Sequence, residues 1–148
     1  MYKRQDAIKA LVAAGASVEA QADEKATPLH YAAMKGHVDA IKALVAAGAS
    51  IEAQADKKMT PLHWAAFEGH ADAIKALAAA GASVEAQADE KATPLHVAAA
   101  QGHADAIKAL VAAGASVEAQ ADTKKTPLHY AAISVSYTHL TLPTKRIV

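Results

Sequence analysis

The chain has 148 residues, of which 53% are hydrophobic, and its 15 basic and 15 acidic side chains give a formal net charge of zero. This balance argues against binding to nucleic acid or to an anionic membrane through a basic patch, and the absence of cysteine excludes disulfides and thiolate metal sites. No apolar run reaches the ~20 residues that span a bilayer, and no secretory signal is visible, so a cytoplasmic location is expected.

The first predicted element is a single helix within residues 1–15. Its apolar residues Ile8, Leu11 and Val12 lie at helical spacing. Met1 aligns with Met34 of the next unit, so the chain begins inside a repeat and a missing upstream part is expected. These three apolar side chains would then lack a partner on one side, although solenoids normally carry a polar cap there.

The next segment contains the signals for a complete unit of two helices. Thr27 is suited to an N-cap and Pro28 to the first helical position, while Gly36 is suited to a left-handed C-cap. A second helix is predicted over Val38–Ala46. Ser50–Met59 then forms an extended turn that leads to the next unit. Helices this short are unstable alone in water, so each unit must bury its apolar stripe against the next.

This unit recurs at an interval of 33 residues. The pattern predicts a half repeat at 1–15, three full repeats at about 16–114 and a partial repeat at 115–133. The structural motif of the repeats is Thr-Pro-Leu-His, at Thr27, Pro28, Leu29 and His30, at Thr60, Pro61, Leu62 and His63, at Thr93, Pro94, Leu95 and His96, and at Thr126, Pro127, Leu128 and His129.

The period, this motif, the Gly36-His37 pair and the Ala-Gly-Ala of Ala47–Ala49 together resemble the ankyrin repeat. The resemblance implies an all-α repeat solenoid, an ankyrin-type stack of helix–turn–helix units with β-hairpin loops. It also implies a scaffold or protein–protein interaction module that binds a partner protein through the concave face of hairpin tips and first helices. A monomer is expected, with exposed repeat ends that can self-associate.

Two positions depart from the family pattern. Lysine replaces the usual glycine at the loop tip, where a left-handed backbone costs a non-glycine residue about 1 kcal/mol. Either the tip accepts that cost in each repeat or the turn has another geometry. Glutamate replaces the usual loop-bracing asparagine. The residues concerned are Lys25, Lys58, Lys91 and Lys124 at the tips, and Glu19, Glu52, Glu85 and Glu118 in the loops.

No catalytic or metal site is predicted, and we expect neither an enzyme nor a cofactor. Equivalent histidines in stacked helices lie roughly 8–10 Å apart, too far to share a zinc ion with bonds near 2 Å. The motif histidine is instead expected to pair with its threonine hydroxyl, bond loop backbone and lock neighbouring units. Tip lysines alternate with Asp23, Asp56, Asp89 and Asp122, which predicts weak surface ion pairs and no phosphate-binding ladder.

Differences between the repeats predict the binding residues. Variation is concentrated just before the motif and at the end of the first helix. An apolar centre is expected from Phe67 and Met59, flanked by Met34 and Trp64. The position of Trp64 is expected to be partly buried between repeats. The full predicted partner-binding set is Glu24, Ala26, Met34, Lys35, Lys57, Met59, Phe67, Glu68, Glu90, Ala92, Ala100, Gln101, Thr123 and Lys125.

Two alternatives to a binding site remain open at this point. The varying residues can reflect neutral drift at exposed positions. The array can also be a structural spacer or regulatory array attached to a missing domain, or a fragment of a symbiont or parasite effector. Residues 134–148 are expected to be an artefactual, disordered tail, because Val135–Thr144 resembles translated sequencing-adapter read-through in a single frame.

Overall fold

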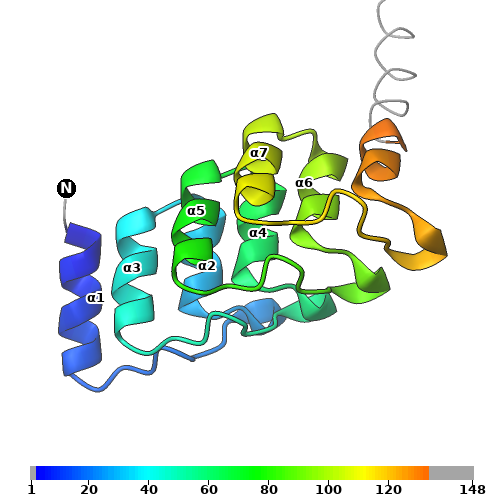
Figure 1. Cartoon of the computed structure of the whole chain (residues 1–148). Coiled ribbons are helices and arrows are strands. Elements are labelled where there is room, and N and C mark those ends of the chain that lie inside the picture. The colour runs from blue at the N-terminus through cyan, green and yellow to red at the C-terminus, as the bar shows by residue number, and fades with distance from the viewer. Residues whose placement is uncertain (1–2, 134–148) are drawn as a thin grey trace, which may run out of the picture.

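A computed structural model describes residues 3–133 as a regular stack of short helices (Figure 1). The predicted tail, residues 134–148, lies outside the described residues. Four tip turns, η1 to η4, each precede the Thr-Pro-Leu-His motif of a repeat. The helices are α1 (Lys3–Ala13), α2 (Pro28–Lys35), α3 (Val38–Ala46), α4 (Pro61–Glu68), α5 (Ala71–Ala79), α6 (Pro94–Gln101), α7 (Ala104–Ala112) and a last helical segment at 127–133, and the turns are η1 (Asp23–Lys25), η2 (Asp56–Lys58), η3 (Asp89–Lys91) and η4 (Asp122–Lys124).

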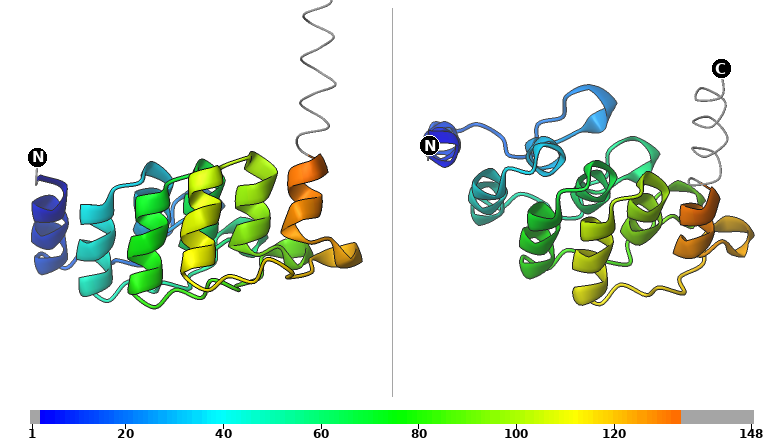
Figure 2. Two further views of the ribbon diagram at one scale, coloured as in Figure 1. Left: turned by 45° about the horizontal axis from the view of Figure 1, so that its top comes forward. Right: turned by 90° about the horizontal axis from the view of Figure 1, so that it is seen from above.

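The helices form two rows. One row contains α1, α3, α5 and α7, and the other contains α2, α4, α6 and the segment at 127–133. The tip turns project on the side of the second row (Figure 2). Each helix contacts the equivalent helix of the next repeat, and this nearest-neighbour arrangement confirms the predicted helical repeat solenoid.

The first helix of each repeat begins and ends where the local signals predict. In α4 the Thr60 side chain accepts a hydrogen bond from the His63 backbone N–H, while Pro61 occupies the first turn. Gly69 ends the helix in a left-handed conformation, with φ of 79°. The same capping arrangement recurs in α2 and α6, because the same residues recur there.

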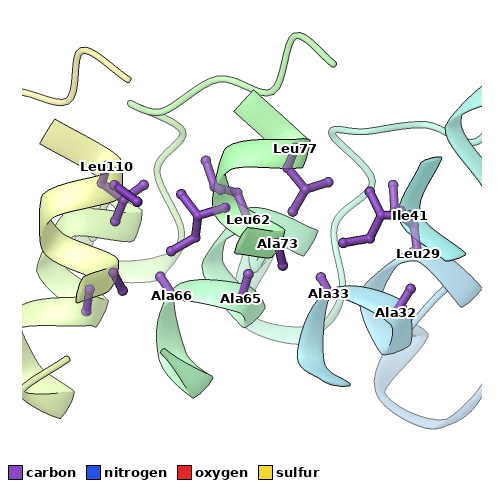
Figure 3. Close-up of a cluster of buried hydrophobic side chains, with 14 of the residues drawn as sticks. Leu29, Ala32, Ala33, Ile41, Leu62, Ala65, Ala66, Ala73, Leu77 and Leu110 are labelled. Carbon is purple, nitrogen blue, oxygen red and sulfur yellow. The ribbon is translucent and has the colours of Figure 1, made fainter. Parts of the chain in front are cut away.

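The core is a thin layer between the two rows (Figure 3). Leu62, Leu77 and Leu110 are among its large side chains, and all three are almost completely buried. Alanines such as Ala65 and Ala73 fill the space between them. Because a methyl group is small, the helix backbones can approach closely, and a core poor in aromatic residues still packs without large voids.

The tip turn takes the first of the two geometries that the sequence allowed. In η3 both central residues are left-handed, with φ of 62° at Glu90 and 59° at Lys91, as in a type I′ turn. The Ala88 N–H donates to the Ala92 carbonyl across the tip at 2.8 Å. The loop is therefore hairpin-like at its tip, although residues 3–133 contain no strand. Each of the four tips carries two strained non-glycine residues.

Replacing Lys91 by glycine is expected to raise the free energy of unfolding by about 0.5–1 kcal/mol. Relief of left-handed strain, about 1–2 kcal/mol, exceeds the extra backbone entropy of glycine in the unfolded chain. Urea denaturation followed by circular dichroism measures the change. Lys108→Gly, at an exposed site inside α7, is the control and should destabilise by about 1 kcal/mol. A loss of stability in Lys91→Gly contradicts the left-handed tip.

Glycines at the helix ends make a close contact between repeats. A Cβ atom built on Gly69 lies 2.7 Å from the His103 ring, whereas one on Gly102 meets nothing within 4 Å among residues 3–133. Both glycines have similar φ, 79° and 74°. The His103 ring also donates from Nε2 to the Phe67 carbonyl at 3.0 Å. The ring of one repeat therefore seats on the glycine of the repeat before it.

Gly69→Ala is expected to cost at least 1 kcal/mol more than Gly102→Ala, because only the first displaces an imidazole ring in addition to straining φ. Thermal unfolding of the two single variants gives the comparison. Combining Gly69→Ala with His103→Ala should remove the difference, since the obstructing ring is gone. Equal losses in the two glycine variants exclude a role for the ring contact.

Candidate binding surface

The motif histidines link each repeat to the loop of the next. In each case ring Nε2 donates to a backbone carbonyl at 2.9 Å, from His30 to Met59, from His63 to Ala92 and from His96 to Lys125. All three rings are completely buried. The sequence predicted this lock between neighbouring units, and the geometry confirms it.

The other ring nitrogen fixes the protonation state. Nδ1 of His63 accepts from the Thr60 backbone N–H at 3.2 Å and from its hydroxyl at 2.9 Å, which requires the neutral ring with its proton on Nε2. Burial lowers the pKa of His63 to about 4, and burial also lowers the pKa of His30. These histidines hold loops together and do not act as acid–base groups near neutral pH.

Glutamate takes over the loop-bracing role between repeats. The Glu52 carboxylate accepts from the Ser83 backbone N–H at 2.7 Å, and Glu19 and Glu85 make the equivalent bonds. The predicted Asp–Lys ion pairs at the tips are wrong. Within residues 3–133 the one ion pair joins Arg4 to Asp39 at 3.4 Å. Exposed charges at the tips gain little from pairing in water, because fixing a long lysine side chain costs entropy.

Within the same residues, no cluster of three or more histidine, aspartate or glutamate side chains is placed to hold a metal ion. Every buried polar side-chain atom that the structure describes has a hydrogen-bond partner. The buried polar side chains of the described array are thus satisfied within the fold, so groups that are free to bind a partner lie on its surface.

A hollow of about 390 Å³ lies where the tips of the first two described loops meet the first helices. Four apolar side chains and four charged ones line it. The sequence predicted the apolar four as one centre, and the fold brings them together. The apolar residues are Met34, Met59, Trp64 and Phe67, and the charged residues are Glu24, Asp56, Lys57 and Glu68.

Two aromatic residues shape this hollow differently. Phe67 is 46% exposed. Trp64 is partly buried, as its position predicted, because its ring packs edge-on against His30 at 5.0 Å and Tyr31 at 6.0 Å between centroids. Trp64 is therefore a fixed wall of the hollow, and Phe67 is the more accessible apolar group.

A second hollow of about 240 Å³ adjoins the first along the stack. The two share Lys57 and Met59. The second adds Ala88, Asp89, Glu90 and Ala92 from the following loop. We call the two hollows together the central groove.

Not all predicted site residues line the central groove. Ala26 is 1% exposed, so its assignment to the binding set is wrong: a buried methyl group offers no surface to a partner. The remaining predicted residues line neither hollow, and Ala100 among them is partly buried. The exposed ones are Lys35, Gln101, Thr123 and Lys125.

Besides Ala88, the sequence reasoning missed two groove residues, Asp56 and Asp89. Both belong to a position that is aspartate in every repeat. A search for variation between repeats cannot find a constant position. Their place at the first residue of a tip turn was the remaining signal, because that turn faces the first helices.

No helix among the described residues has the length and apolar character needed to cross a membrane. Comparison with curated proteins gives no match. The family model for ankyrin repeats, in three copies, matches residues 1–88 and 80–142. Ankyrin repeats are generally protein–protein interaction modules. From its 33-residue period, capped helix pairs and this match, the chain belongs to the ankyrin-repeat family.

Proposed function

We propose that this array binds a partner protein through the central groove, with Phe67 and Met59 as the main apolar contacts. The observation that carries the proposal is the gathering of four large apolar side chains in one hollow, all of them at positions where the repeats differ. Apolar anchors surrounded by polar groups are typical of protein interfaces.

Neutral drift explains this surface less well. Exposed positions that drift accumulate small or polar residues, as at Gln101 and Ala100 in the following repeat. Phe67 instead places a large ring at 46% exposure, where it contributes little to folding. A side chain that is costly to expose and unnecessary for packing is better explained by a partner.

The charges of the groove favour protein over nucleic acid. Carboxylates outnumber the single lysine of its lining, and they repel phosphate groups. The function we propose needs neither a cofactor nor catalysis, because the groove brings together no nucleophile and base.

The double variant Phe67→Ala, Met59→Ala tests the proposal. Alanine is the residue that the array itself has at the equivalent positions 100 and 92, so the fold should tolerate both changes with a loss below about 1 kcal/mol per site. A random peptide library displayed on phage is selected on the wild-type chain. The selected peptides should lose at least about tenfold in affinity for the double variant.

Thermal unfolding of both proteins is the control. If selected peptides bind the double variant as tightly as the wild type, the proposed site is wrong. If the free energy of unfolding of the variant is lower by several kilocalories per mole, the two side chains are part of the core. If no peptide is retained at all, the structural spacer becomes the better description of the array.

A further inference from the structure

The lining of the first hollow is acidic. Glu24, Asp56 and Glu68 contribute three carboxylates against the single ammonium group of Lys57, a net charge of −2. Within residues 3–133 none of these three carboxylates forms an ion pair. They lie beside an apolar surface and are not paired with Lys57, so a partner's cation can approach them without breaking an ion pair.

The second hollow extends the acidic lining. It adds Asp89 and Glu90 and shares Lys57 with the first. The geometry of the tip turns determines which charges take part. The first left-handed residue of each of the turns η1 to η3, Glu24, Lys57 or Glu90, lines the groove, whereas the following lysine lines neither hollow.

Consecutive residues of these turns therefore differ in whether they line the groove. The invariant lysines Lys25, Lys58 and Lys91 are not part of the groove lining. The chain as a whole has no net charge, so the acidic character of the groove arises from the fold and not from composition. An uncompensated local charge of one sign steers association with the opposite sign.

We propose, building on the function proposed above, that the groove binds an extended partner segment with one large apolar residue and a lysine or arginine about three residues away. The apolar residue sits in the first hollow against Phe67 and Met59. Neighbouring repeats lie about 10 Å apart, and an extended chain advances about 3.3 Å per residue, so three residues reach the second hollow.

The recognition chemistry follows from the two kinds of lining. Met34, Met59, Trp64 and Phe67 offer apolar area to the anchor. Asp89 and Glu90 offer carboxylate oxygens to the cation, which arginine can engage with two hydrogen bonds at once. A segment with an acidic residue at the second position would be repelled.

Three synthetic peptides of equal length test the proposal. Each carries a leucine anchor, and the residue three positions away is arginine, glutamine or glutamate. Fluorescence anisotropy against the full chain is expected to give the arginine peptide at least about tenfold tighter binding than the glutamine peptide, and no binding by the glutamate peptide. Affinity of the arginine peptide should fall as salt is added.

Two pairs of variants locate the effect. Glu68→Gln with Glu90→Thr introduces residues that the array has at Gln101 and Thr123, and should weaken the arginine peptide about tenfold while leaving the glutamine peptide unchanged. Asp72→Asn with Asp105→Asn is the matched control. It changes the net charge equally at exposed sites of the other helix row, α5 and α7, and should leave both peptides unchanged.

The outcomes separate this inference from the function on which it rests. If arginine and glutamine peptides bind equally well and both depend on Phe67, the binding site stands and the cation preference is wrong. If the control pair weakens binding as much as the groove pair, the attraction is general electrostatics and the inference fails. If no peptide depends on Phe67, both the inference and the proposed site fail.

Discussion

Acidification from about pH 7 to about pH 5 is expected to lower the free energy of unfolding by about 2 kcal/mol through His63 alone. Its pKa is about 4 in the folded chain because the ring is buried, against 6.5 when unfolded. The unfolded state therefore binds a proton more readily. The contribution of neutral His63 to the free energy of unfolding is present in full above pH 6.5 and is lost as the pH falls towards 4. The lowered pKa of His30 adds a loss of the same sign.

Urea denaturation at a series of pH values measures this loss. The range above pH 5 is informative because carboxylates, with ordinary pKa values near 4, remain mostly ionised there. His63→Gln removes the titrating group, so its stability should be lower at pH 7 but should fall by about 2 kcal/mol less over the same range. If the free energy of unfolding of this variant falls with pH as steeply as that of the wild type, His63 is not the origin of the loss.

Proton NMR supplies a second measurement that does not depend on a variant that folds. The ring protons of His63 should titrate far below pH 6.5, or not at all before the chain unfolds. A ring that titrates normally in the folded chain contradicts the hydrogen-bonding scheme, because protonation of Nδ1 would break both bonds from Thr60.

Leu77→Ala is expected to cost about 3 kcal/mol, within the range for leucine-to-alanine changes in tightly packed cores. Leu77 is completely buried between the helix rows, in contact with a core built largely of alanine. Helices whose small side chains already meet closely cannot collapse further into the cavity. Thermal or urea unfolding of the variant measures the loss.

The array contains its own matched control for this prediction. Leu11 occupies the same repeat position in α1, in a closely similar sequence, but is 59% exposed. Leu11→Ala should cost less than about 1 kcal/mol, because little apolar area is removed from water at that site. Similar losses in the two variants would show that the core does not carry the stability of the stack.

The sequence predicted the local structure of this protein in detail. The helix α3 spans Val38–Ala46, as expected, and Gly36 adopts the left-handed cap. The lock made by the motif histidines was also predicted. These features depend on signals within a few residues, and a threonine cap, a first-turn proline or a terminal glycine acts through its own backbone neighbours.

The candidate site was predictable in part. Comparison of the repeats identified Phe67, Met59 and Met34, because these positions vary while most of the unit does not. It could not identify Asp56 and Asp89, which are constant. It also could not exclude Ala26, which is buried although its counterparts Met59 and Ala92 are only partly so. Equivalent positions of different repeats differ in burial, because neighbouring residues cover some of them more than others.

The sequence by itself determined the 33-residue unit, its helix ends and its need to stack, because short amphipathic helices have no other way to bury their apolar stripe. Only the tertiary structure decided how completely each leucine is covered, which histidine ring seats on which glycine, and which tip residue faces the groove. Burial and local charge depend on side chains from neighbouring repeats, and near-identical repeats do not encode which neighbours are present.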